Sequence, residues 1–79
     1  MRKSNTDQKI DDQFNDVLEK IIYRRKRLGF SQTYMSKKLE ITLSSYYKME
    51  KGKSKLGFKR LLEISEVLEV DIEYFLNKE

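Results

Sequence analysis

The sequence contains no cysteine, histidine, proline or tryptophan, and only three of its 79 residues are glycine. Without cysteine, neither a disulfide framework nor a thiolate zinc site can form. Without histidine, the side chain that most often serves as a general base and as a metal ligand is missing. No apolar run approaches the ~18 residues of a membrane helix, and the N-terminus lacks the apolar core of a signal peptide. We therefore expect no metal, no cofactor and no membrane partner.

The missing proline and the position of the three glycines favour an all-α fold. Gly29, Gly52 and Gly57 all stand at plausible helix ends, and so few sites for sharp chain reversal disfavour an all-β fold. A chain of this length forms one small domain that buries only about 60% of its unfolded surface. Stability should be modest, so association with a second copy would help.

Charge is distributed unevenly along the chain. Residues 20–60 hold 13 Lys and Arg against two acidic residues, a local charge of +11, whereas residues 1–19 sum to −2 and residues 61–79 to −5. The whole-chain value of +4 conceals a basic face. Binding of phosphate groups is the simplest use for such a surface, and the acidic C-terminal part should then face away from it.

Five helices are predicted after a polar N-terminal segment. Residues 1–11 lack periodicity and are expected to form a flexible tail, so the folded domain would span residues 12–79. A first helix over about 12–28 carries apolar residues at helical spacing and ends at Gly29, where Phe30 can close a Schellman-type cap. Its inner stripe consists of Phe14, Val17, Leu18, Ile21 and Ile22.

Two short helices follow, separated by a tight turn. Ser31 is placed to cap a helix that ends at Leu39, and Thr42 is placed to cap a helix that ends before Gly52. Glu40 and Ile41 form the turn between them. The inward residues are expected to be Met35, Ser36, Leu39, Tyr46 and Met49.

The last two helices are expected over about 58–68 and 72–77. Asp71 is placed to cap the second of them. The inner stripe of the helix over 58–68 is expected to contain Phe58, Leu61, Leu62, Ser65 and Leu68, with Ile64 beside it. Together the five helices predict a compact orthogonal bundle.

The stretch Leu28–Leu39, followed by Ile41, Thr42, Tyr46 and Met49–Lys53, resembles the phage-repressor/Cro (Xre-type) helix-turn-helix family. Residues 61–76 are similar to the fourth and fifth helices of that family. The joint spacing of a few positions carries the resemblance: Gln32, Leu39, Glu50, Gly52, Leu68, Val70 and Leu76. It implies a lambda-repressor-like five-helix bundle in which helices 2 and 3 form the helix-turn-helix.

The resemblance also implies a function. The expected protein is a sequence-specific DNA-binding transcriptional regulator, a repressor, that binds a pseudo-palindromic double-stranded operator as a homodimer through the recognition helix 42–50. Gln32 would contact a phosphate and brace that helix. Base edges and the adjoining backbone would be met by Thr42, Leu43, Ser44 and Lys48, and phosphates by Lys51 and Lys53.

Several of these residues have alternative roles. Lys48 could donate to guanine or touch only phosphate, and Leu43 could contact a thymine methyl group or be a neutral surface residue. Tyr47 could reach a phosphate or sugar, or simply pack on the surface. Arg25 is a candidate DNA contact within the charge run 24–27. It also matches, with Glu50, a pair that forms an internal salt bridge in some members, unless both side chains point to water.

Two residues depart from the family pattern. Glu40 stands where the family usually has glycine, which would cost on the order of 1 kcal/mol if the backbone there is left-handed. Tyr46 replaces a smaller branched residue, so either the core is roomier or the ring is partly exposed. Near the C-terminus, Ile72, Tyr74 and Leu76 are candidates for the dimer interface, although core burial would explain Leu76 equally well.

A function of another class stays open. The same fold could serve as an antitoxin or protein-interaction module, with a protein partner held by the N-terminal tail and DNA binding secondary. An enzyme is not expected, because no nucleophile motif or clustered catalytic pair is present. We expect a cytoplasmic protein, bacterial or phage-encoded, without a separate effector-binding domain.

Overall fold

The computed structural model describes residues 5–77, and within that range it contains five helices and no strand. The predicted all-α class is therefore confirmed. The helices are α1 (Asn5–Arg27), α2 (Gln32–Leu39), α3 (Leu43–Glu50), α4 (Phe58–Val67) and α5 (Glu73–Leu76).

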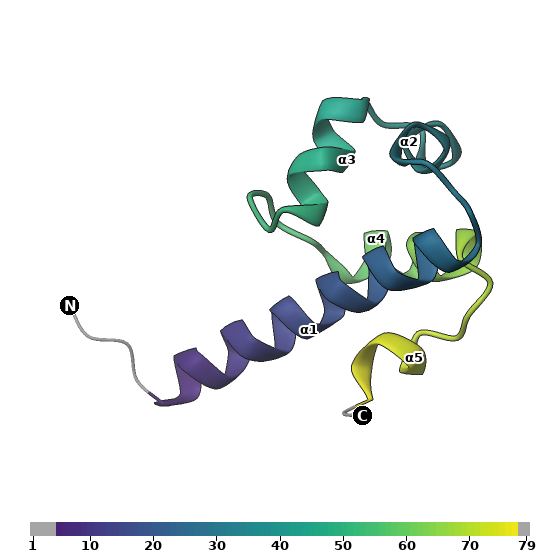
Figure 1. Cartoon of the computed structure of the whole chain (residues 1–79). Helices are drawn as coiled ribbons and strands as arrows, with labels where there is room; N and C mark the ends of the chain where they lie inside the picture. Colours follow the sequence, from purple (N-terminus) through teal and green to yellow (C-terminus); the bar gives the residue numbers. More distant parts are fainter. Residues whose placement is uncertain (1–4, 78–79) are drawn as a thin grey trace.

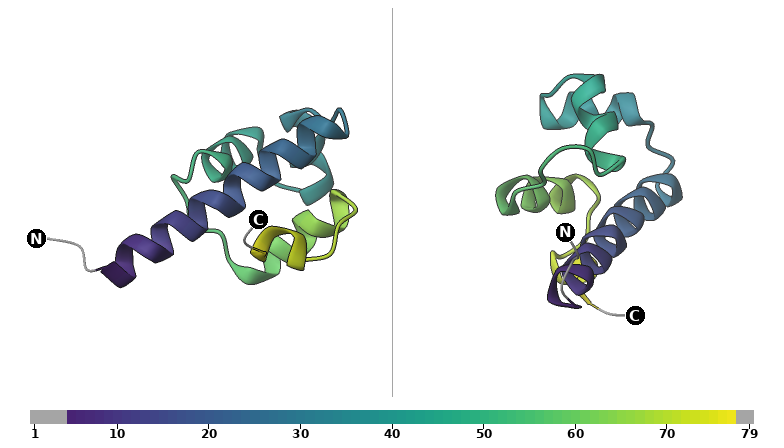
Figure 2. Two further views of the ribbon diagram at one scale, coloured as in Figure 1. Left: turned by 60° about the horizontal axis from the view of Figure 1, so that its bottom comes forward. Right: turned by 90° about the vertical axis from the view of Figure 1, so that its left-hand side faces the viewer.

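The long helix α1 spans the molecule, and the shorter helices lie around its C-terminal half (Figures 1 and 2). Its C-terminal half packs against α3 and α5, and α2 packs against α3 and α4. Figure 1 shows α2 and α3 above α1 and α5 below it, with α4 between these two levels. The Lys20 ammonium group on α1 donates a hydrogen bond to the carbonyl oxygen of Asn77, which follows α5. The N-terminal half of α1 projects beyond the bundle.

The core gathers side chains from all five helices. Ile21, Met35, Tyr46, Ile64 and Leu68 are fully buried. The other buried hydrophobic residues are Leu18, Leu39, Met49, Leu61 and Phe75. The inward positions predicted for α2 and α3 are thus confirmed, and these two short helices are held by packing rather than by their length.

The predicted inner stripe of α4 is partly wrong. Phe58 is 65% exposed and Leu62 is 42% exposed. At 100° per residue, the buried positions Leu61, Ile64 and Leu68 share one side of the helix, and Leu62 lies well over 90° from their centre. The helix has more apolar residues than inward positions, so Leu62 lies on its outer face and Phe58 on the flank beside it.

The start of α1 also differs from the prediction, because the helix begins at Asn5 rather than near residue 12. Residues 5–10 are all exposed, so this part of the helix has no regularly spaced apolar residues from which it could be predicted. One support is the hydrogen bond from the Gln8 side chain to Asp12, one turn later, at 3.0 Å. Residues 5–11 of the expected tail are therefore helical, and residues 1–4 lie outside the described residues.

The end of α1 agrees with the prediction. The N–H of Phe30 donates to the carbonyl oxygen of Arg25 and the N–H of Gly29 to that of Lys26, both at 3.0 Å. This pair of bonds is the Schellman pattern, and Gly29 supplies the positive φ of 76° that it needs.

The start of α5 does not agree. The N-cap residue of α5 is Ile72, without a side-chain hydrogen bond, and Asp71 contributes only its carbonyl oxygen, which accepts from the N–H of Tyr74. Ile72 already has helical φ and ψ of −60° and −29°, so the helical backbone begins directly after Asp71. The capping prediction fails at the side chain, because no hydrogen bond among the described residues joins the Asp71 carboxylate to the first turn of α5.

Candidate nucleic-acid interface

Both short helices begin at the capping residues that the sequence predicts. The Ser31 hydroxyl accepts from the N–H of Tyr34 at 2.9 Å, and the Thr42 hydroxyl accepts from the N–H of Ser45 at 3.0 Å. Each bond satisfies an N–H group that a helix start leaves unpaired. The Thr42 hydroxyl also donates to the Ser45 hydroxyl at 2.9 Å, so both side chains are engaged in fixing the start of α3.

The turn between α2 and α3 has a left-handed residue at Glu40, with φ 59° and ψ 44°. Its N–H and that of Ile41 donate to the carbonyl oxygens of Lys37 and Ser36, which closes α2. Ser36 is buried, and its small side chain, hydrogen-bonded to the Thr33 carbonyl oxygen at 2.8 Å, fits where α2 packs on α3. Because Glu40 has the left-handed backbone, the strain expected from a glutamate at this position is present.

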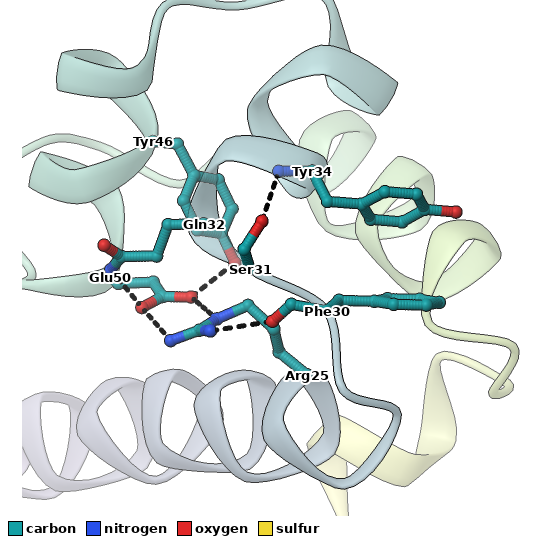
Figure 3. A network of polar contacts seen from close by, with 7 residues as sticks. All are labelled: Arg25, Phe30, Ser31, Gln32, Tyr34, Tyr46 and Glu50. Carbon is teal, nitrogen blue, oxygen red and sulfur yellow. Dashed lines mark hydrogen bonds and ion pairs between the residues drawn. The ribbon is translucent and has the colours of Figure 1, made fainter.

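The end of α3 is tied to α1 and α2 by a buried polar network (Figure 3). Arg25 donates to both carboxylate oxygens of Glu50, from Nε to Oε2 at 2.7 Å and from Nη2 to Oε1 at 3.2 Å. Gln32 donates to Oε1 at 2.9 Å, and the Tyr46 hydroxyl donates to Oε2. The remaining guanidinium nitrogen of Arg25 donates to the Phe30 carbonyl oxygen at 3.0 Å.

The electrostatics of this network keep the Arg25 guanidinium and the Tyr46 hydroxyl protonated, the forms in which both donate hydrogen bonds. Burial alone would lower the pKa of Arg25, but the hydrogen bonds and the charge of Glu50 outweigh it, so the pKa lies above its ordinary value. Burial, and then the hydrogen bond and charge of Glu50, raise the pKa of the Tyr46 hydroxyl far above its ordinary value. Among the described residues, no buried side-chain nitrogen or oxygen lacks a partner.

The network settles three questions that the sequence left open. The internal Arg25–Glu50 salt bridge exists, and the alternative in which both side chains point to water is wrong. Tyr46 is fully buried, because its hydroxyl reaches Glu50, so the partly exposed alternative is wrong. Arg25 is only 8% exposed, so its guanidinium group is not available on the surface and we withdraw it as a DNA contact.

Within the basic run at the end of α1, Arg24 also has an internal partner. Its Nε donates to the carbonyl oxygen of Leu68, at the end of α4, at 2.9 Å. Lys26 and Arg27 are exposed. The signal was present in the sequence, because Arg24 and Arg25 lie three and four residues after the buried Ile21 and thus share its side of the helix.

On its outer side, α3 presents the predicted base-contacting residues to solvent. Leu43 and Tyr47 are each 47% exposed and lie one turn apart, and Ser44 and Lys48 form a second exposed pair with the same spacing. Lys51 lies over the Tyr47 ring with its Nζ 5.5 Å from the ring centroid. Lys53 is exposed in the following loop, and Thr42 is exposed but its hydroxyl serves the cap.

Two further sites in the prediction are placed by the structure. Gln32 is half-buried, and its amide nitrogen is bonded to Glu50, which fits the bracing part of its expected role. Of the candidate dimer residues, Ile72 and Tyr74 are half-buried and pack against the core, whereas Leu76 is 55% exposed. Core burial therefore does not account for Leu76.

Tyr34 was not predicted from the sequence to be part of this surface. Tyr34 on α2 is 38% exposed and stacks on Phe30, with ring centroids 4.3 Å apart (Figure 3). The Nζ of Lys38 lies 5.7 Å from the centroid of the Tyr34 ring. The spacing of Phe30, Tyr34 and Lys38 at intervals of four residues was the available signal.

Residues 5–77 contain neither a membrane-spanning helix nor a metal-binding cluster of acidic side chains. None of their helices has the length and apolar character needed to cross a membrane. Within the same residues, no group of three or more Asp and Glu side chains is arranged to hold a metal ion.

A capped two-helix unit with an anchored inner side and a polar, basic outer side defines a helix-turn-helix protein. Residues 21–75 match the family model described as helix-turn-helix, so the chain belongs to this family, the Xre-type helix-turn-helix proteins, as its sequence predicted.

Two curated relatives are similar to the chain. One, from Sinorhizobium medicae, is named as an uncharacterized HTH-type transcriptional regulator, and one from Rhizobium meliloti carries the same description. Each is 39% identical over 59 residues, which is 75% of this chain and 42% of the relative. The chain thus spans about two fifths of the length of these relatives. No solved structure is significantly similar to it.

Proposed function

We propose that this protein is a sequence-specific DNA-binding transcriptional regulator that represses by occupying a pseudo-palindromic operator as a homodimer. The observation that carries the proposal is the two-sided construction of α3. Its inner side is fixed by the buried Glu50 network, while Leu43, Ser44, Tyr47 and Lys48 are exposed on its outer side. Family membership and the two relatives named as regulators support it.

Affinity would come mainly from phosphate contacts. Lys48, Lys51 and Lys53 are all exposed, on α3 and in the loop that follows it. Each cation that neutralises a phosphate releases counterions, so binding should weaken steeply as salt rises. The half-buried Gln32 and the exposed Tyr47 would add polar contacts to the DNA backbone.

Base reading would come from the first turns of α3. Lys48 can donate to the O6 and N7 atoms of guanine, and Leu43 can pack against a thymine methyl group. Ser44 can donate to or accept from a base or a phosphate. Two copies of α3 would lie in successive major grooves about 34 Å apart, which makes the operator an inverted repeat.

The location of the DNA surface can be tested before any operator is known. The affinity for a fluorescent random-sequence 30-bp duplex would be measured by anisotropy over a range of salt concentrations. Lys48→Ala and Lys53→Ala should each weaken binding and reduce the salt slope by about 0.9. The matched control is Lys9→Ala, which removes an exposed lysine from the projecting half of α1 and should leave both values unchanged. The opposite ranking of these variants would contradict the proposed surface.

One observation supports a second candidate function, that of a protein-interaction module such as an antitoxin. Ile10 is 57% exposed on the projecting half of α1, in line with the apolar stripe of that helix. Deletion of residues 1–13 would also remove about two and a half turns of α1, so Ile10→Ser is the cleaner test. If wild-type protein fails to bind DNA at ~50 mM salt and Ile10→Ser abolishes binding to a protein partner, the second candidate replaces the first.

A further inference from the structure

Two exposed apolar side chains lie on the outer face of α4 and on the flank next to it. Phe58 is 65% exposed, the highest value among the large hydrophobic residues of the described chain, and Leu62 one turn later is 42% exposed. Leu62 lies on the side of α4 that points away from the buried Leu61, Ile64 and Leu68, and Phe58 lies on the adjoining flank, about 90° from their centre. Neither is needed by the DNA surface on α3. Neighbouring exposed apolar side chains are one feature of association sites, and what surrounds these two decides whether they form one.

Opposite charges accompany Leu62 on the outer face of α4. Lys59 and Glu66 are both exposed, and at 100° per residue they project within about 20° of each other, two turns apart. Among residues 5–77 neither has an ion-pair partner, whereas Arg60 and Glu63 on the flank of α4 pair with each other at 2.8 Å. The outer face of α4 is therefore basic at its start, apolar in its middle and acidic at its end.

A helix face with this order is complementary to itself when reversed. We propose that α4 pairs antiparallel with α4 of a second copy across a two-fold axis, and that this contact forms the homodimer of the proposed function, on which the inference rests. With the axis beside Leu62 and Glu63, Lys59 lies level with the partner subunit's Glu66, and Glu66 with the partner subunit's Lys59. A two-fold interface repeats every contact in this way.

In the same arrangement, Leu62 and Phe58 both contact the partner subunit. Leu62 lies near the axis, where it meets the partner subunit's Leu62. Phe58 lies level with residues 66–67 of the partner, on the flank of α4 that faces α5. That flank contains a hollow lined by Ser65, Glu66, Glu69 and Tyr74, among others. The hollow therefore lies where the phenyl ring of the partner subunit's Phe58 arrives.

The pairing also suits DNA binding. The two-fold axis of an antiparallel helix pair is perpendicular to both helices, so it brings like flanks together. One flank of α4 adjoins α2, in a hollow lined by Lys38, Leu39, Glu40, Leu62 and Glu66, and the other adjoins α5. Figures 1 and 2 show α2 and α3 on one side of α4 and α5 on the other. Both helix-turn-helix units of the dimer would thus face the same way.

This interface differs from the one that the sequence suggested. Ile72 and Tyr74 already pack against the core, and only Leu76 of the three candidates is largely exposed. Tyr74 remains an interface residue in this arrangement, because it borders the hollow that would receive the phenyl ring of Phe58. The α4 face offers two apolar side chains and a charge pair, whereas α5 offers one exposed leucine.

The test is the dimer dissociation constant of the full chain, measured by sedimentation equilibrium without DNA. Leu62→Ser should raise that constant about tenfold, since two partly exposed leucines per dimer lose their apolar contact. The matched control is Leu76→Ser, the same change at a somewhat more exposed leucine on α5, which should leave the constant unaltered. If Leu76→Ser weakens the dimer and Leu62→Ser does not, the interface lies on α5 and the proposal is wrong.

A charge exchange gives a second readout that no loss of folding can imitate. Lys59→Glu and Glu66→Lys should each weaken the dimer severalfold, and the double variant should recover most of the loss. Failure of the double variant to recover would overturn the antiparallel register. A wild-type chain that stays monomeric at millimolar concentration would overturn the interface altogether. If that monomer still binds a single half-site through Lys48, the proposed DNA-reading function survives the failure of this inference.

Discussion

The buried pair Arg25–Glu50 makes the strongest prediction about stability. Both side chains are almost entirely shielded from water, with side-chain exposures of 10% and 4%. Removing one partner leaves an uncompensated charge in the interior, which costs about 3–5 kcal/mol. A chain of this length is stable by about 4–12 kcal/mol in total, so Arg25→Met or Glu50→Leu should remove a large part of the free energy of unfolding.

The appropriate assay is urea unfolding followed by circular dichroism, with a double-mutant cycle. Replacing both partners, as in Arg25→Met with Glu50→Leu, removes both charges and should destabilise less than either single change. The control is Arg27→Met, an exposed arginine two residues away, which should change stability by no more than about 0.5 kcal/mol. Single changes that cost under 1 kcal/mol, or a double variant whose cost equals the sum of both, would refute the reasoning.

Three further predictions concern the backbone at Glu40, the buried hydroxyl of Tyr46 and the contact between Leu43 and DNA. Glu40→Gly should raise the free energy of unfolding by about 1 kcal/mol because φ is 59° there, whereas Lys37→Gly inside α2 should lower it by about the same amount. The raised pKa of Tyr46 means that above its ordinary value of 10.0 only the unfolded chain releases the proton. The stability of wild type relative to Tyr46→Phe should therefore be constant below pH 10 and fall by about 1.4 kcal/mol per pH unit above it. Finally, replacing the contacted thymine by uracil should weaken wild type but not Leu43→Ala.

Each of these has a result that would contradict it. Equal effects of glycine at positions 40 and 37 would mean that the turn stores no strain. A wild-type advantage over Tyr46→Phe that persists unchanged at pH 11 would mean that the folded chain ionises as readily as the unfolded one. Equal loss of affinity on uracil substitution in wild type and Leu43→Ala would remove Leu43 from the thymine contact.

The sequence predicts best what short-range chemistry determines. Ser31 and Thr42 cap the helices that follow them, and Gly29 ends α1, because each effect depends on a few neighbouring residues. The projecting turns of α1 were missed because a solvated helix carries no apolar period. A second left-handed residue, Glu69 with φ 61°, was missed. A left-handed helix end is usually recognised in a sequence by its glycine, and here the residue is a glutamate.

Packing decided what the sequence left ambiguous. In α4, apolar residues at 58, 61, 62, 64 and 68 fit more than one inner stripe, and only the contacts with the other helices select among them. The sequence resemblance suggested the Arg25–Glu50 pair. It did not show that Gln32 and Tyr46 converge on the same carboxylate, because that depends on how α1, α2 and α3 are set against each other.

The most direct test of the central claim is selection of bound duplexes from a randomised ~30-bp DNA library at ~150 mM salt. The account predicts recovery of an inverted repeat whose half-sites are about one helical turn apart, with guanine and thymine positions that Lys48→Ala and Leu43→Ala relax. A pool that stays random while binding remains salt-sensitive would contradict it, because the basic face would then hold DNA without reading its sequence.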